Sequence, residues 1–312
     1  FLCALRAWIR KHFLFVKKLI YFTSMRLNAF PLKPDVLYWL TKSYQQRRLK
    51  PLEVIAYFII SMLASVAGAI CGIGGGVIIK PTLDLFHLDT VSTISFLSGC
   101  TVLGMTCYSV GKSMIARDSQ VNLRTGTPLA IGAAVGGIVG KQLFTTVGAL
   151  FPDPNTVGAV QASALAVITL GTLIYTIFKA RIPTLKVNSL AGCMLIGLAL
   201  GVMSSFLGIG GGPINLVVLF FFFSMDTKVA AQNSLYIILF SQITSVGATI
   251  VTGTVPEFAW YKLVLMVAGG ILGGILGRIC NRRMDNKAVD KLFMGLMAVI
   301  IGISIYNTWQ FL

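Results

Sequence analysis

Charged residues are scarce in this chain of 312 residues. Asp, Glu, Lys and Arg make up 12% of it, against about 25% in a soluble domain, and only ten of them are acidic. This scarcity excludes a soluble enzyme, a nucleic-acid-binding domain and a disordered tail as the main interpretation. Histidine occurs only twice, and no two of the six cysteines form a CxxC pair, so the sequence indicates no metal site, no disulfide framework and no cofactor.

Long uncharged stretches dominate the chain instead. One lies between Glu53 and Lys80. The others cover residues 90–111, 125–140, 154–178, 187–225, 229–256, 263–277 and 292–312. Because about 20 apolar residues span a bilayer as a helix, most of these stretches correspond to one helix each. The sequence predicts an all-α polytopic membrane protein, multi-pass in the cell membrane, which is the inner membrane in a bacterium.

Basic residues are concentrated at the N-terminus. Residues 1–50 hold eleven Lys and Arg and a single acid, and so contribute +10 of the net charge of +16. They contain no apolar run of the kind that a secretory signal peptide needs, and nothing else in the chain supports nucleic-acid binding. We expect residues 1–51 to form a basic amphipathic segment that lies at the interface with anionic lipid.

The rest of the chain repeats. CGIGGGVI at residues 71–78 returns as LGIGGGPI at 207–214, an offset of 136. GGIVGK at 136–141 returns as GGILGR at 273–278, an offset of 137, and GTLIYTIF is weakly echoed by GISIYNTW further on. Matched blocks in the same order predict a duplication. The two homologous transmembrane halves are residues 52–180 and 181–312.

The basic loops indicate an orientation. Lys and Arg are enriched at residues 112–124, 179–186 and 278–291, and such loops face the cytoplasm. Placing all three inside requires residues 187–225 to form a hairpin broken at its glycines. Its second arm, 213–225, is about 20 Å long and falls short of a crossing, as in a re-entrant hairpin. The halves then form an inverted repeat with glycine-broken helical hairpins, as in many secondary transporters. The same symmetry places residue 51 outside, although basic residues precede it.

The glycine clusters have two interpretations. Three consecutive glycines cost a helix about 1 kcal/mol each relative to alanine, and broken backbone at membrane depth is tolerated only where it is buried or lines a cavity. Helices that start at such a break aim N–H groups and positive dipole ends at one point, which suits a small anion. Alternatively, glycines allow close helix packing. We favour the anion site for the two GIGGG segments, and packing for residues 136–140 and 273–277.

Two copies of G-x-G-G-G after an apolar span, the first followed by Pro81, and a polar run that ends in serine, resemble the TauE/SafE sulfite exporter family of membrane permeases over residues 52–310. The resemblance implies export, or sometimes import, of sulfur-containing anions. The substrate-binding positions that it implies are Gly72, Gly74, Gly75, Gly76, Gly208, Gly210, Gly211 and Gly212, with the polar runs Ser92-Thr93-Ile94-Ser95 and Gln232-Asn233-Ser234. The chain departs from the family at Pro213, directly after the second glycine cluster, and at Lys80, where an apolar residue is usual.

Ionisable residues inside a span are costly and are candidates for a function. Lys80 can supply a cation for the anion while Asp84 holds it in place, or the two can pair structurally. His87 can take up a proton, although its place at the end of the arm favours an interfacial role. The amide groups of Asn215 and Asn233 suit an oxyanion, with helix-to-helix hydrogen bonds as the alternative.

The favoured function is a secondary carrier or uniporter that moves a small sulfur-containing oxyanion across the cytoplasmic membrane. An inside-negative potential drives anions out by about 2.3 kcal/mol per charge per 100 mV, which favours export. The alternative is a membrane-embedded enzyme of sulfur or lipid metabolism, which would need clustered His, Asp or Cys ligands that the sequence lacks. Sulfite, thiosulfate and sulfonates stay open as substrates, as does the oligomeric state.

Overall fold

The computed structural model describes residues 51–311 apart from 87, 117–118, 151–153 and 210. The chain divides into two units, residues 1–50 and 51–312. The expectations for the basic N-terminal segment, His87 and Gly210 therefore lie outside the described residues.

The described residues form α-helices joined by short connections. The first half contains α3 (Pro51–Cys71), α4 (Gly76–Leu85), α5 (Val91–Ile115), α6 (Leu123–Leu150) and α7 (Pro154–Phe178). After η1 (Lys179–Arg181), the second half contains α8 (Leu190–Phe206), α9 (Pro213–Phe223), α10 (Thr227–Val251), α11 (Trp260–Arg283) and α12 (Asn286–Phe311). Seven of these helices are long and apolar enough to cross a membrane, and α4, α8 and α9 are shorter. The predicted all-α polytopic membrane fold is confirmed.

Capping residues and proline define several helix ends. The Thr90 side chain accepts a hydrogen bond from the Thr93 N–H at the start of α5. Pro213 stands at the first position of α9, where the missing N–H costs no hydrogen bond. The same helix ends at Ser224, which adopts a left-handed conformation with φ of 53°.

Each half begins with a helical hairpin that turns at its GIGGG segment. In the second half, the N–H groups of Leu185 and Val187 donate to the carbonyls of Phe221 and Phe222 at 2.7 and 2.9 Å. The chain therefore enters α8 and leaves α9 on the same side of the bundle. With 11 residues, α9 is about 16 Å long and cannot cross a bilayer core of about 30 Å. The predicted helical hairpin at 187–225, broken at its glycines, is confirmed, and the short α9 fits the re-entrant arrangement that we predict.

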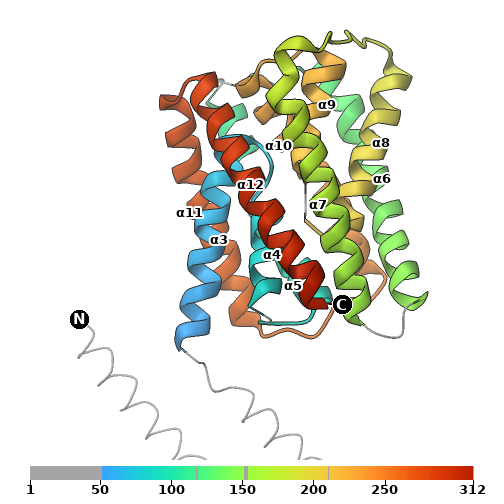
Figure 1. Ribbon diagram of the computed structural model, residues 1–312, viewed down its shortest axis with the longest axis vertical. Helices are drawn as coiled ribbons and strands as arrows, with labels where there is room; N and C mark the ends of the chain where they lie inside the picture. Colours follow the sequence, from blue (N-terminus) through green and yellow to red (C-terminus); the bar gives the residue numbers. More distant parts are fainter. Residues whose placement is uncertain (1–50, 87, 117–118, 151–153, 210, 312) are drawn as a thin grey trace, which may run out of the picture. The chain divides into compact units, whose positions relative to one another are not determined.

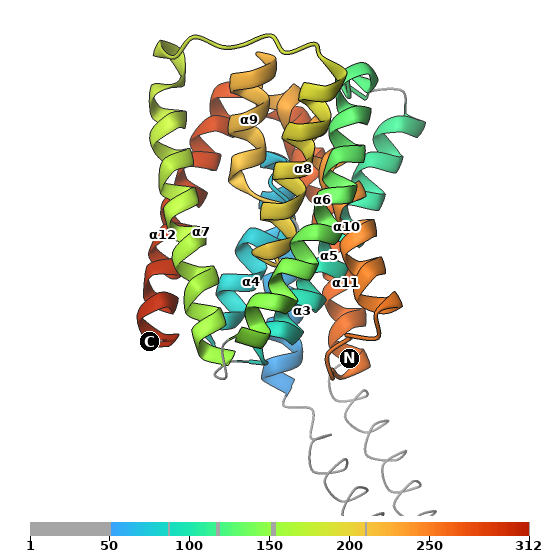
Figure 2. The same cartoon turned by 90° about the vertical axis from the view of Figure 1, so that its right-hand side faces the viewer.

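Corresponding helices of the two halves run in opposite directions. In Figure 1, α3 starts at the lower end of the bundle and α7 rises from it, whereas α8 descends from the upper end and α12 descends to the C-terminus. The view turned by 90° shows α7 and α12 side by side in the same opposed directions (Figure 2). These directions are the ones that an inverted repeat requires.

The halves interlock rather than stand side by side. The first helix of each half lies along the fourth helix of the other, so that α3 packs on α11 and α8 packs on α6. Glycines permit both contacts: a Cβ added at Gly136 would lie 2.1 Å from the Leu198 carbonyl oxygen, and one at Gly273 would lie 2.4 Å from that of Met62. The predicted packing role of residues 136–140 and 273–277 is confirmed.

The three basic segments lie at one end of the bundle, the upper end in Figure 1. Lys179, after α7, pairs with Asp290 of α12 at 2.6 Å. The backbone N–H of Gln120, between α5 and α6, donates to Gln232 Oε1 of α10 at 2.8 Å. At the opposite end, Lys262 pairs with Asp89 at 2.6 Å.

We expect this basic end to face the cytoplasm. In a background with all six native cysteines replaced, Gln120→Cys and Arg283→Cys should both be protected from a membrane-impermeant maleimide added outside intact cells. Thr254→Cys, at the opposite end, should be labelled. Protection at residue 120 together with strong labelling at residue 283 would contradict the arrangement.

Candidate functional site

The two GIGGG segments touch each other inside the bundle. A Cβ added at Gly76, the first residue of α4, would lie 1.9 Å from the carbonyl oxygen of Ile209 in the second segment. A Cβ added at Gly211 would lie 3.2 Å from the carbonyl oxygen of Ile73 in the first segment. The short helices α4 and α9 start at this contact and run to opposite ends of the bundle (Figure 1).

Equivalent glycines in the two segments meet equivalent positions on the long helices. Gly72 and Gly208 have positive φ values of 75° and 65°, which favour glycine. A Cβ at Gly72 would lie 2.3 Å from the Ala231 Cα on α10, and one at Gly208 would lie 2.6 Å from the Ser95 Oγ on α5. Ser95 and Ala231 are 136 positions apart, as are the two glycines. The glycines thus allow each segment to touch the long helix of the other half.

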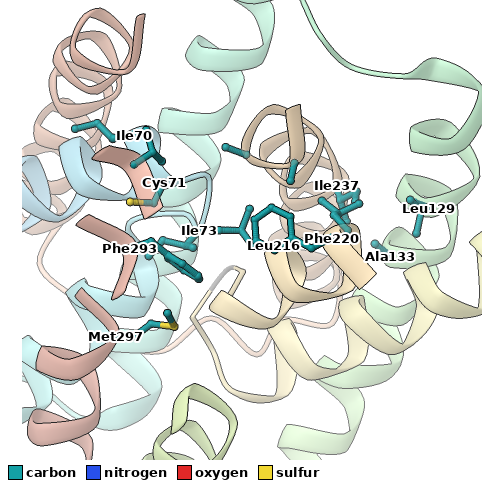
Figure 3. Close-up of a cluster of buried hydrophobic side chains, with 14 of the residues drawn as sticks. Ile70, Cys71, Ile73, Leu129, Ala133, Leu216, Phe220, Ile237, Phe293 and Met297 are labelled. Carbon is teal, nitrogen blue, oxygen red and sulfur yellow. The ribbon is translucent and has the colours of Figure 1, made fainter. Parts of the chain in front are cut away.

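The isoleucine of each segment anchors it. Ile73 and Ile209 are 0% and 1% exposed. Ile73 belongs to a buried apolar cluster with Leu216 of α9 and Phe293 of α12, so the first segment is packed against helices of the second half (Figure 3). Because both isoleucine side chains are buried, they fix the positions of the two GIGGG segments to which they belong.

Lys80 lies at the second glycine segment, although it belongs to the first half. Its side chain is buried and its ammonium donates to the Leu207 carbonyl at 3.0 Å and to Gln161 Oε1. The Gln161 Nε2 in turn donates to the Phe206 carbonyl at 2.6 Å. Lys80 and Gln161 therefore bind the carbonyl end of α8, which carries partial negative charge. Gln161 was not predicted, and its only sequence signal is an amide inside the apolar stretch 154–178.

Ser95 and Asn215 both lie beside the second segment and hold a buried oxygen without a hydrogen-bond partner. Ser95 faces Gly208, and its Oγ has no partner. Asn215 is 2% exposed, and its Oδ1 has none either. These groups are therefore available for a ligand with donors or, in the case of Ser95, for an oxyanion.

The polar residues at 232–234 in the second half differ in their hydrogen bonding. The Asn233 amide accepts a hydrogen bond from the Asn122 N–H and donates to the carbonyls of Gln120 and Val229. This amide holds the connection between α5 and α6. Ser234 is fully buried and its Oγ has no partner.

The contact between the glycine segments itself is closed. The cavity beside Gly211, Gly212 and Asn215 has a volume of only 10 Å³, about the minimum that a single water molecule needs. Larger space lies beside the first segment, where a cavity of 360 Å³ reaches from the basic end of the bundle to Ala69 and Ala231. In this conformation, space for a small ligand therefore lies beside the first segment and not at the contact of the two.

A family model described as sulfite exporter TauE/SafE matches residues 57–305. The chain belongs to the TauE/SafE family. Two curated relatives from Bacillus subtilis (strain 168), the probable membrane transporter proteins YunE and YdhB, are each 23% identical to it. The matches cover 80% of this chain, with 96% of YunE and 98% of YdhB. No solved structure matches the chain. The TauE/SafE family member described here is thus a multi-pass membrane protein of a transporter family.

Proposed function

We propose that this protein is a secondary carrier or uniporter, not an enzyme, that moves a small sulfur-containing oxyanion such as sulfite, thiosulfate or a sulfonate out of the cytoplasm. The observation that carries the proposal is the contact between the two GIGGG segments in the interior of the bundle, where two short helices start. Helix starts of this kind favour negative charge. The description of the family as a sulfite exporter supports the choice of anion.

The proposal includes an inverted repeat. The opposed directions of corresponding helices and the exchanged contacts of α3 and α8 with α11 and α6 support it. In transporters built this way, the substrate binds near the bilayer midplane where the halves meet, and one part rocks against the other. The packed contact at Gly76 and Ile209 is the point about which such a movement would open either side.

Export needs no ATP in this scheme. A dianion leaving an inside-negative cell at 100 mV gains about 4.6 kcal/mol. This free energy corresponds to a concentration ratio of roughly a thousand, since about 1.4 kcal/mol is a factor of ten. A uniporter of sulfite would therefore keep the cytoplasmic concentration low by itself.

The test is counterflow in proteoliposomes. Vesicles loaded with unlabelled sulfite should take up labelled sulfite transiently, and thiosulfate or a small sulfonate should compete. Gly211→Ala should abolish the uptake, because Gly211 has φ of 136° and the new Cβ would lie 2.5 Å from Ile238 Cδ1. Gly247→Ala is the matched control, since nothing lies within 4 Å of its Cβ position. No counterflow with any of these anions would contradict the proposed function.

A further inference from the structure

A large cavity lies at the basic end of the bundle. Its volume is 360 Å³, within the range of small-molecule sites. Ser119 and Gln120, in the connection between α5 and α6, line its mouth, and it ends at Ala69 and Ala231 beside Gly72 of the first glycine segment. The cavity thus leads from the basic end to one of the two GIGGG segments.

A second, much smaller cavity ends at the other glycine segment. Its volume is 30 Å³, space for about two water molecules, and Ser95 and Gly208 line it. Lys141, from the half of α6 that is remote from the basic end, also lines it. This cavity therefore lies on the opposite side of the glycine contact from the first.

The two cavities are lined by equivalent positions of the repeat. The offsets of 136 and 137 that align the glycine blocks relate Ser109, Ser113 and Arg278 of the large cavity to Ser245, Thr249 and Lys141 of the small one. The same offset relates Ala231 to Ser95. Because the correspondence holds for helices from both halves, the two cavities occupy equivalent places in the repeat and differ mainly in volume, 360 Å³ against 30 Å³.

The chemistry of both cavities suits an anion. Arg278, Arg282 and Lys228 line the large cavity, and none of the described residues that line it carries a carboxylate. Its Ser109 is 7% exposed, with an Oγ that has no hydrogen-bond partner. In the small cavity the Oγ atoms of Ser95, Ser204 and Ser205 are buried without a partner, beside Lys141. Hydroxyl donors next to a fixed cation in a low-dielectric wall are what an oxyanion requires.

Aromatic residues account for the difference in size. At two positions where the large cavity has Gln232 and Asn281, the small one has Phe96 and Phe144. The Lys141 ammonium lies over the Phe144 ring, 4.9 Å from its centroid, so that the cation is covered.

We propose that these cavities are the cytoplasmic and external binding vestibules of one transported anion, that Arg278 and Lys141 are the equivalent cations that contact it in each, and that the structure is the state open to the basic side. The inference rests on the proposed function for the identity of the anion and for the use of both sides in turn. The site itself is defined by the cavities.

The first experiment measures the charge preference of the large cavity, with a small sulfonate as the probe. In the background without native cysteines, Ser109→Cys is treated with the anionic 2-sulfonatoethyl methanethiosulfonate and with its cationic trimethylammonium analogue. The anion preference is the ratio of the anionic to the cationic reaction rate, divided by the same ratio for a free thiol in solution. This preference should be at least tenfold. Arg278→Gln should lower the preference to within threefold of one, and Arg278→Lys should retain most of it.

Lys291→Gln is the matched control, because it removes the same charge from the same end of the bundle but lies outside the cavity lining. It should leave the preference unchanged. A ratio near one for Ser109→Cys alone would overturn the proposal, as would a preference that survives Arg278→Gln or that is lost equally in Lys291→Gln.

The second experiment addresses the closed cavity from the opposite face of the membrane. Ser245→Cys should react with the sulfonate reagent at least tenfold more slowly than Ser109→Cys does from the basic face. Phe144→Asn introduces the side chain found at the equivalent Asn281 and should raise that rate about tenfold. Lys141→Gln should remove the anion preference. A Ser245→Cys variant that reacts equally fast with and without Phe144→Asn would overturn the assignment of the closed vestibule.

The two proposals fail separately. If sulfite, thiosulfate and sulfonates show no counterflow but the anion preference at Ser109→Cys depends on Arg278, the vestibule stands and the proposed substrate is wrong. If counterflow succeeds but the preference does not depend on Arg278, the proposed function stands and the vestibule assignment is wrong.

Discussion

Gly76→Ala is expected to inactivate the protein, whereas Gly212→Ala, the same change at the equivalent position of the other half, is expected to be tolerated. A methyl group at Gly76 would lie 1.9 Å from the Ile209 carbonyl oxygen and 2.7 Å from its carbon. Both atoms are backbone, so neither can rotate away, and the two glycine segments must separate. Such overpacking costs about 3 kcal/mol, the upper end of the usual range, because the backbone has to move.

The contrast with Gly212 arises from its surroundings. Its φ of −165° is extended backbone that alanine adopts without strain, and the nearest atom to an added Cβ is Ile209 Cδ1 at an ordinary 3.5 Å. Replacing a glycine by alanine at a compatible backbone changes the free energy of unfolding by about 0.4–1 kcal/mol in the stabilising direction.

Thermal unfolding in detergent and sulfite counterflow measure both effects. Gly76→Ala should lower the Tm by roughly 6–12 °C, given about 2–4 °C per kcal/mol for a domain of this size, and abolish counterflow. Gly212→Ala should keep both near the parent values. Gly111→Ala, with nothing within 4 Å of the new Cβ, controls for the substitution itself. Equal losses at Gly76 and Gly212 would show that the contact with Ile209 does not explain the glycine.

The parts of the fold that were predicted from sequence are those that a local pattern determines. Uncharged stretches of about 20 residues gave the long helices, and the double-length stretch at 187–225 gave the hairpin α8–α9. The exchange of partners between halves was not predicted. An apolar helix face packs equally well against many others, and only the three-dimensional match of the glycines at 132, 136 and 140 to the backbone of α8 selects this partner.

The candidate site was predicted in outline only. The two GIGGG segments meet, but Lys80 and Gln161 act on them across the halves, which a spacing along one helix cannot indicate. Arg278 and Lys141 end two blocks that were recognised as repeats and interpreted through their glycines alone. Their cavities form only when helices of both halves come together, so no single segment of sequence carries the signal.

Lys80→Met is expected to lower both stability and transport strongly. The Lys80 ammonium is the donor to two buried acceptors, the Leu207 carbonyl and Gln161 Oε1. Methionine fills a similar volume but donates no hydrogen bond, so both acceptors lose a partner at a cost of about 1–3 kcal/mol each. The second glycine segment begins at the residue after Leu207. Without the Lys80 hydrogen bond this segment should shift from its position, and counterflow should fall at least tenfold.

A double-mutant cycle decides whether Lys80 acts through this contact. Gln161→Leu alone removes one acceptor of Lys80 and leaves the Phe206 carbonyl without its donor. If Lys80 and Gln161 hold the end of α8 as a unit, Lys80→Met/Gln161→Leu should lose less stability than the sum of the single changes, by about 1–3 kcal/mol. Additive losses in Tm would show that Lys80 and Gln161 do not act as a unit. Lys80 would then contact the anion directly. In that case Lys80→Met should abolish the sulfite-dependent rise in Tm, and Gln161→Leu should retain it.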